Sequence, residues 1–140
     1  GIAWGAIGAA MDCYDTALRY AKERVQFDRP IGGFQLQQKK LAEMITEITK
    51  AQLLAWRLGT LKNEEKATPA QISMAKRNNV EMALMVARTS RGMLGGMGIM
   101  DEYPIMRHMM NLESVYTYEG THEIHLLITG MDVTGINAFV

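Results

Sequence analysis

Residues 68 to 93, "TPAQISMAKRNNVEMALMVARTSRGM", carry the clearest helical pattern in this sequence. Thr68 suits an N-cap, Pro69 is tolerated in a first helical turn, and Gln71 completes a capping box with Thr68. The residues that follow recur at three- and four-residue steps, the spacing of one helix face. This predicted inner stripe consists of Ile72, Ala75, Met82, Val86, Thr89 and Met93. We therefore predict a long amphipathic helix that the glycine-rich residues 95–98 end.

The rest of the chain shows the same helical period. Pro30 and the Gly32-Gly33 pair interrupt it, since neither continues a helix. Further helical segments are predicted up to about Arg24, from about Gln35 to Leu61, briefly around Ile105 to Leu112, and from about Thr121 to Thr129. The predicted inner faces are Ile2, Ala6, Ala10, Cys13, Ala17, Ala21 and Val25 for the first helix, and Leu41, Ile45, Ile48, Ala55 and Leu58 for the second. No segment alternates as a strand would. We predict an all-α fold, an antiparallel four-helix bundle of three long helices and a shorter fourth.

Composition limits the classes of function. Lysine plus arginine and aspartate plus glutamate each number 15, so the net charge is zero, and no basic stripe points to nucleic acid. Cys13 is the only cysteine, which excludes an internal disulfide and a cysteine-built zinc site. The uncharged opening residues 1–11 are too short to span a bilayer and lack the basic start of a secretory signal. The chain begins with glycine inside a helical pattern, so we expect 1–140 to be one domain of a longer protein that is not secreted.

The stretch "YTYEGTHEIHLL", Tyr116 to Leu127, presents one carboxylate, Glu119, just before the last helix. Glu119, His122 and His125 have the spacing of helix-borne metal ligands. A di-iron bundle needs the Glu-x-x-His motif twice, and only Glu119 has a histidine three places on, so we predict no metal site. Two interpretations stay open. Glu119 is an acid that favours the helix start, or it is a base made stronger by the aromatic and methionine side chains around it.

Two other motifs also have two interpretations each. In "KERVQF", Arg24 either offsets the dipole at a helix C-terminus or, with Gln26 and Phe27, binds a phosphate and a flat ring. In "RGMLGGMGI", the glycines either end the helix or let backbone N–H groups approach a cofactor. The second motif follows a helix, so it is neither a Walker nor a Rossmann loop.

The order and spacing of these motifs resemble one family, the FAD-dependent acyl-CoA dehydrogenases. The motifs are R-x-Q-F at Arg24 to Phe27, F-Q at Phe34-Gln35, L-G-G-x-G at Leu94 to Gly98, and Y-E-G-T at Tyr118 to Thr121. The resemblance covers essentially the whole chain and corresponds to the C-terminal helical domain, with the N-terminal helical and middle β-domains absent from this sequence. "TYEGTHEIH" and the closing "TGINAF" are most similar to the glutaryl-CoA dehydrogenase branch.

The resemblance implies roles for the matching residues. Glu119 would remove the α-proton of the thioester while the β-hydrogen leaves as hydride to the flavin, and Gly120 would line the acyl-CoA pocket. The implied FAD contacts are Thr121 and Glu123 at the last helix, Arg24, Phe27 and Gln35 toward the cofactor of a neighbouring subunit, the stretch Gly92, Met93, Leu94, Gly95 and Gly96, and Phe139. Two residues depart from the family pattern. Gly92 removes a side chain that most members have, and Met97 replaces a common polar or aromatic residue.

The resemblance also implies partners. They are an acyl-CoA substrate, FAD shared across the subunits of a homo-oligomer that is usually a tetramer, and electron-transfer flavoprotein or a similar acceptor. Decarboxylation to crotonyl-CoA would follow in the glutaryl branch. The enzyme would be cytoplasmic in a bacterium and in the mitochondrial matrix in a eukaryote. The alternative from another class is a non-catalytic helical oligomerisation bundle.

Overall fold

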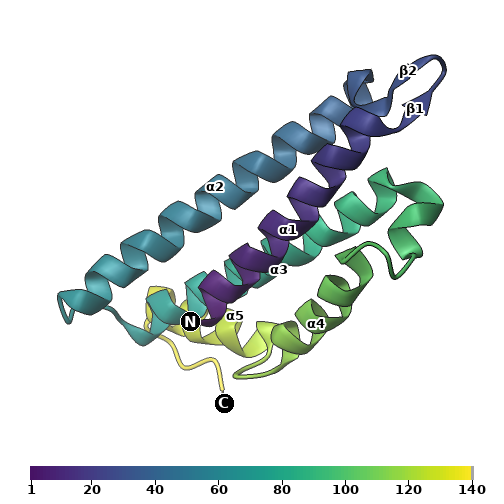
Figure 1. Cartoon of the computed structure of the whole chain (residues 1–140). Coiled ribbons are helices and arrows are strands. Elements are labelled where there is room, and N and C mark those ends of the chain that lie inside the picture. Colours follow the sequence, from purple (N-terminus) through teal and green to yellow (C-terminus); the bar gives the residue numbers. More distant parts are fainter. Residues whose placement is uncertain (140) are drawn as a thin grey trace.

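The computed structural model describes residues 1–139 as a set of packed helices (Figure 1). The helices are α1 (Ile2–Glu23), α2 (Gln35–Asn63), α3 (Pro69–Met93), α4 (Ile105–Thr117) and α5 (His122–Thr134). The short elements are β1 (Val25–Gln26), β2 (Arg29–Pro30) and the 3-10 helices η1 (Ile31–Gly33) and η2 (Gly95–Ile99). The all-α prediction is therefore confirmed, and the strands form only one small antiparallel hairpin.

Helix α3 lies at the centre and contacts each of the other four helices. The predicted capping box is present at its start. The Gln71 N–H donates to Thr68 Oγ1 over 3.2 Å, and the Thr68 N–H donates to Gln71 Oε1 over 3.0 Å. Alanines on α1 and α3 are fully buried where the two helices meet, among them Ala10, Ala17 and Ala83. Small side chains thus let α1 pack closely on α3.

Several predicted boundaries differ from the structure. The short segment expected near Ile105 is a 13-residue helix that continues to Thr117, so the described chain has five helices. Helix α5 continues past the expected end near Thr129, because Gly130 is accommodated inside it, and Gly135 ends it with φ +70°. A glycine inside a helix costs only about 1 kcal/mol, whereas a glycine with positive φ is a common helix stop.

Three residues of the predicted inner faces are exposed instead. Val25 lies in the hairpin, Ile45 faces outward on α2, and Ile72 faces outward on α3. Their neighbours Met44 and Ser73 take the buried positions on α2 and α3. The period was predicted correctly, but α2 and α3 carry apolar side chains on more than one face.

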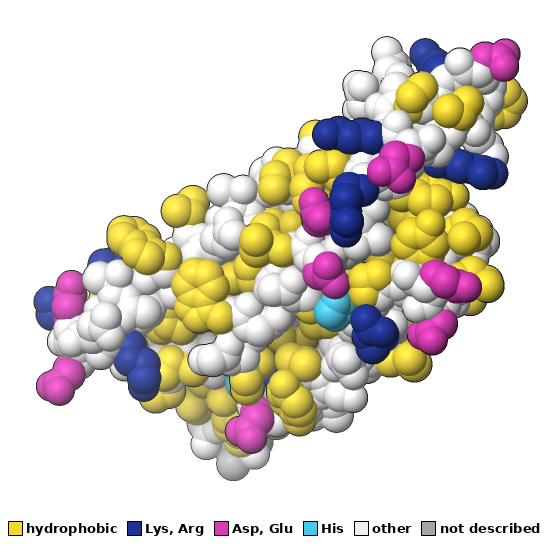
Figure 2. Space-filling view, in the orientation of Figure 1, with side chains coloured by type: hydrophobic (Ala, Val, Ile, Leu, Met, Phe, Trp, Pro, Cys, Tyr) yellow, Lys and Arg dark blue, Asp and Glu magenta, His cyan; other side chains and the backbone are white. Residues whose placement is uncertain are grey.

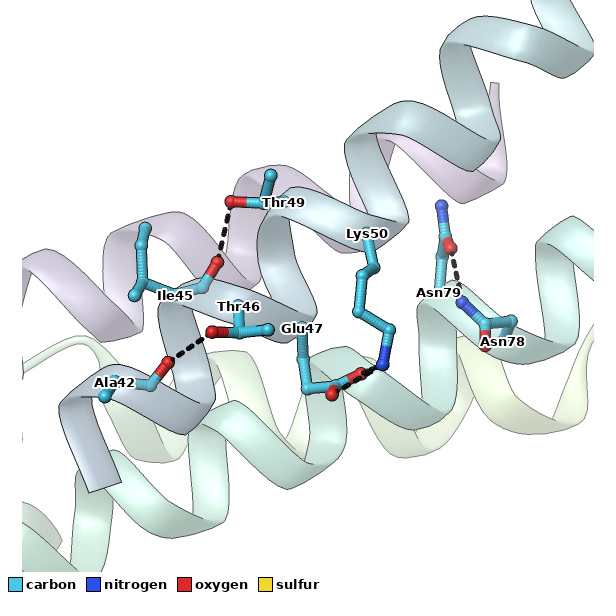
Figure 3. A network of polar contacts seen from close by, with 8 residues as sticks. All are labelled: Ala42, Ile45, Thr46, Glu47, Thr49, Lys50, Asn78 and Asn79. Atoms are coloured by element: carbon cyan, nitrogen blue, oxygen red, sulfur yellow. Dashed lines mark hydrogen bonds and ion pairs between the residues drawn. The ribbon is translucent and has the colours of Figure 1, made fainter. Parts of the chain in front are cut away.

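The surface of the bundle combines scattered charge with large apolar areas, which Figure 2 shows as yellow patches between the charged side chains. On α2, the hydroxyls of Thr46 and Thr49 each donate over 2.8 Å to the carbonyl four residues earlier, as Figure 3 shows. Leu53 and Trp56 on the same helix are exposed. No helix within residues 1–139 is long and apolar enough to cross a membrane.

Candidate functional site

The loop between α4 and α5 carries the predicted base. Glu119 has a φ of +54° and Gly120 a φ of +98°, so the chain passes through two left-handed residues in succession. A side chain is strained in this region, which makes Glu119 an uncommon choice on conformational grounds alone. The Glu119 side chain is exposed, so the apolar surround expected from the sequence is not provided by residues 1–139. The loop projects one carboxylate into the open space beside the bundle.

Gly120 is required by its surroundings as well as by its φ. A Cβ placed on Gly120 would lie 2.9 Å from Nε2 of His125, which is closer than carbon and nitrogen normally approach. The imidazole of His125 is buried directly beneath the loop. Burial lowers its pKa, and the charge on Lys76 lowers it further, while the backbone of Glu119 and Gly120 opposes the shift. His125 is therefore a neutral packing element under the loop near pH 7.

Lys76 on α3 reaches the same loop from the bundle interior. Its side chain is nearly covered, with 5% of the residue exposed. Its Nζ donates to the carbonyl oxygens of Gly120 at 2.8 Å, Tyr118 at 3.1 Å and Tyr116 at 3.4 Å. Burial lowers the pKa of Lys76, and the negative charge of Glu119 opposes that shift. The sequence did not point to Lys76, because a lysine in a helix is normally exposed. In the structure it shares one helix face with buried Ser73 and Val80.

The two histidines considered as metal ligands have other neighbours. The ring of His122 stacks on Tyr116 with centroids 4.5 Å apart and planes 9° apart. Its Nε2 lies 3.9 Å from a carboxylate oxygen of Glu81 on α3. Within residues 1–139, no group of three or more histidine, cysteine, aspartate or glutamate side chains is arranged to hold a metal ion.

Thr121 and Glu123 begin helix α5. Thr121 Oγ1 accepts a hydrogen bond of 3.4 Å from the Ile124 N–H. The carboxylate of Glu123 is exposed, and its pKa is lowered by its own backbone N–H and by the Thr121 hydroxyl. Both residues thus stabilise the helix start, and this does not prevent the cofactor contact predicted for them.

A second group of predicted residues meets at the opposite end of the bundle. Arg24 follows α1, and the glycines 92, 95 and 96 lie where α3 ends, on one cavity of about 590 Å³. A Cβ built on any of these three glycines meets no atom within 4 Å, so a ligand can approach the chain closely at these positions. The exposed Arg24 guanidinium suits a phosphate group. An exposed guanidinium beside glycine backbone is a combination that can bind a phosphate group. The side chains of Met93 and Leu94 are buried, so a contact at these two residues would come from backbone.

Phe27 and Gln35 line a neighbouring cavity of about 630 Å³, which shares Gln26, Ile31 and Gln37 with the first. Phe27 is 86% exposed and lies edge-on to Phe34, with 6.1 Å between the ring centroids. The Arg29 guanidinium lies 3.9 Å from the centre of the Phe34 ring. No sequence motif pointed to Arg29, which adds a cation to the Arg24 end of the bundle.

The two groups are far apart in one chain. Tyr118, next to Glu119, shares a cavity with Ile2 and Gly5 at the start of α1, whereas Arg24 follows its end. Helix α1 has 22 residues, which at 1.5 Å per residue separates these ends by roughly 33 Å. Figure 1 shows the hairpin after α1 at the end opposite the N-terminus. Phe139 joins neither group; it is exposed in the C-terminal tail, where its N–H donates to Asn137 Oδ1 over 2.9 Å.

Comparison with known proteins identifies the relatives of this chain. Residues 1–134 match the family model described as "Acyl-CoA dehydrogenase, C-terminal domain". The crystal structure of glutaryl-CoA dehydrogenase from Mycobacterium smegmatis is 57% identical, with a TM-score of 0.98 over 100% of this chain and 36% of that one. A glutaryl-CoA dehydrogenase from the same organism in complex with FADH2 is 50% identical, with a TM-score of 0.98 and the same coverage. The short-chain specific acyl-CoA dehydrogenase of Megasphaera elsdenii is 36% identical over 130 residues, which are 93% of this chain and 34% of the relative. The chain thus spans about a third of the length of these relatives.

Proposed function

Because this chain belongs to the acyl-CoA dehydrogenase family, as the match over residues 1–134 shows, we propose that it is the base-bearing C-terminal domain of a longer FAD-dependent enzyme that oxidises acyl-CoA thioesters. The observation that carries the proposal is the Glu119 loop. A strained backbone with φ +54° presents an exposed carboxylate just before α5, within the Tyr118–Thr121 motif, and this carboxylate forms no ion pair within residues 1–139. Strain of this kind collects at functional sites.

In this proposal Glu119 takes a proton from the α-carbon of the thioester. Such a proton is weakly acidic, so its removal needs a positioned carboxylate and a donor for the developing enolate oxygen. The Glu119 N–H donates no backbone hydrogen bond within residues 1–139, so it is available as that donor. When bound, FAD supplies the acceptor for the hydride that leaves the β-carbon. Because Glu119 is exposed in this chain, we propose that other parts of the full-length enzyme cover it and exclude water.

We propose glutaryl-CoA as the substrate, with decarboxylation to crotonyl-CoA after oxidation. The identity of 57% to a glutaryl-CoA dehydrogenase, against 36% to a short-chain specific enzyme, supports this choice. The short-chain acyl-CoA thioesters are the competing substrates, and the experiment below separates the two.

We further propose that FAD binds between copies of the chain. The Arg24 end and the Glu119 end are separated by the length of α1, so a cofactor whose flavin faces Glu119 of one copy would meet Arg24, Phe27, Gln35 and the glycines of another. Exposed apolar residues on α2 and α5, such as Trp56 and Val133, offer surface for such an assembly, which we propose is a tetramer. An electron-transfer flavoprotein or a similar acceptor would reoxidise the cofactor.

The test uses the full-length polypeptide, purified with its flavin. Anaerobic addition of glutaryl-CoA should bleach the flavin absorbance of the parent, and Glu119→Gln should abolish the bleaching. Glu113→Gln is the matched control, since it removes an exposed carboxylate on α4, six residues before Glu119, and should retain bleaching. Bleaching by butyryl-CoA but not by glutaryl-CoA would keep the family chemistry and exclude the proposed substrate. A full-length protein without flavin would favour a non-catalytic oligomerisation bundle.

A further inference from the structure

We propose that Lys76 is the positioning residue for Glu119. By binding the backbone on both sides of Glu119, it holds the carboxylate in the orientation in which it can remove the substrate proton. This inference rests on the proposed function, in which Glu119 is the base. Its structural part concerns the loop alone and can be tested without turnover.

The hydrogen bonds of Lys76 bracket Glu119. The ammonium group has three donors, and here each of them meets a carbonyl oxygen. Tyr118 precedes Glu119, Gly120 follows it, and the distances to their oxygens are 3.1 and 2.8 Å. The third bond, of 3.4 Å, goes to Tyr116 in the last turn of α4. A single side chain from α3 thereby ties the end of α4 to the residues just before α5.

This arrangement explains how a non-glycine residue stays at φ +54°. A left-handed side-chain-bearing residue costs of order 1–3 kcal/mol and persists only where its surroundings hold it. The last carbonyls of a helix also lack partners within the helix and carry a partial negative charge. The Lys76 ammonium satisfies both needs, because it neutralises the end of α4 and fixes the peptides flanking Glu119.

The three hydrogen bonds of Lys76, called the clamp below, do not involve the carboxylate of Glu119. Within residues 1–139, Lys76 and Glu119 form no ion pair at 4.0 Å or less, since the three donors of Lys76 are directed at backbone oxygens. A lysine bound to the carboxylate would compete with the substrate proton. A lysine bound to the neighbouring peptides sets the direction of the side chain and does not compete. His125 packs against Gly120 from the same side, but it contributes volume and no charge near pH 7.

The test compares three variants of the full-length holoenzyme. Lys76→Met removes the charge and the three donors and keeps most of the side-chain length; Lys76→Gln is the second variant in case the methionine protein does not fold. Asn79→Ala is the matched control on the same helix. Asn79 is equally buried and donates to Ala51 O over 3.2 Å and Ala3 O over 3.4 Å, contacts with α1 and α2 that do not involve the Glu119 loop.

Two readouts separate a positioning role from a structural one. Amide hydrogen exchange over residues 114–122 should rise in the Lys76 variants, and not in Asn79→Ala, because the loop has lost its clamp. With whichever acyl-CoA bleaches the parent, kcat per bound flavin should fall ~10- to 100-fold in Lys76→Met, since a displacement of about 1 Å can cost 10²-fold. KM should change by less than ~3-fold, because the lost interaction acts on the chemical step. Asn79→Ala should lower thermal stability and keep kcat within ~2-fold.

The inference is overturned if the Lys76 variants keep the parental kcat, or if Asn79→Ala loses as much kcat at the same loss of stability. Failure of the proposed function gives a different pattern. In that case the parent does not bleach, or Glu119→Gln bleaches like the parent. The exchange rates of residues 114–122 then decide whether Lys76 clamps the loop.

Discussion

The imidazole of His125 occupies the position toward which a side chain at residue 120 would point, with Nε2 only 2.9 Å from a Cβ built on Gly120. Gly120 also has a φ of +98°, which L-residues rarely adopt. We therefore expect Gly120→Ala to destabilise the full-length protein by about 1–3 kcal/mol, from backbone strain and overpacking together. Denaturant unfolding measures this loss of stability, as a shift in the midpoint of the transition that includes this domain.

Gly130→Ala is the control for that change. Gly130 lies inside α5, and a Cβ there meets no atom within 4 Å. This substitution should be neutral or stabilising by about 0.5–1 kcal/mol, because alanine is the better helix former. Equal midpoints for Gly120→Ala and Gly130→Ala would mean that the loop relaxes without cost and that His125 does not restrict it.

His125 also predicts a pH dependence of stability. Its pKa is lowered in the folded protein, chiefly by burial, so the unfolded chain binds a proton that the folded chain resists. The stability is then complete above the ordinary histidine pKa of about 6.5 and is lost as the pH falls below it. The parent should lose more thermal stability between pH 7.5 and 5.5 than His125→Gln, which cannot titrate. Between pH 8 and 9 the two proteins should respond alike, since the imidazole is neutral in both states. Parallel losses below pH 6.5 would contradict this assignment.

Gly98 predicts a fold defect that is separate from any cofactor effect. A Cβ on Gly98 would overlap the carbonyl oxygen of Arg91, which is backbone and cannot move aside. Gly98→Ala should therefore lower the free energy of unfolding by about 1–3 kcal/mol, which appears as a lower denaturant midpoint. Gly96→Ala, two residues earlier, meets open space and should leave the midpoint of the flavin-free protein unchanged. Because Gly96 lines the proposed cofactor cavity, its effect should appear as weaker FAD retention in fluorescence titration. A lower midpoint for Gly96→Ala together with an unchanged midpoint for Gly98→Ala would contradict the predicted overlap at Gly98.

The sequence predicted what local patterns encode. The capping box of Thr68 and Gln71 and the helical period that runs along α1, α2 and α3 are set by residues within a few positions of one another. The faces were less predictable. Ile45 and Ile72 point outward because helices α2 and α3 carry apolar residues on a second face, and a sequence alone does not say which face the rest of this chain covers.

In the candidate site, too, the local motif was predictable and the packing around it was not. The Y-E-G-T motif was visible in the sequence, but the environment of Glu119 was not, since its clamp comes from a residue 43 positions earlier in the chain. A lysine in a helix normally predicts an exposed position. The burial of Lys76 beside Ser73 and Val80, and its three carbonyl partners, arise from the packing of α4 against α3, which no local pattern in the sequence shows. The expected apolar surround was wrong for these residues, because Tyr118 is itself exposed beside the base.

The separation of Arg24 from Glu119 along α1 predicts complementation between two inactive variants. If each FAD lies between copies, one copy supplies the Arg24 end and another supplies the base. Full-length Arg24→Ala should lose flavin, and Glu119→Gln should bind flavin and not bleach. Refolding or coexpressing the two together creates sites that combine the intact Arg24 of one chain with the intact Glu119 of the other. With equal amounts and random pairing, about half of the dimers are hybrids, and one of the two sites in each hybrid is intact. Such mixtures should therefore recover up to about a quarter of the parental activity per chain.

Differentially tagged chains make the measurement direct, since hybrid oligomers can be isolated by two successive affinity steps. The control mixes Glu119→Gln with a second base variant, Glu119→Ala, in which no combination restores the carboxylate, and it should stay inactive. If FAD instead contacts Arg24 and Glu119 of the same chain, every site in the hybrid carries one lesion and activity stays at the background of the separate variants. Hybrid activity that depends on dilution would further show that the shared site forms only in the assembled oligomer.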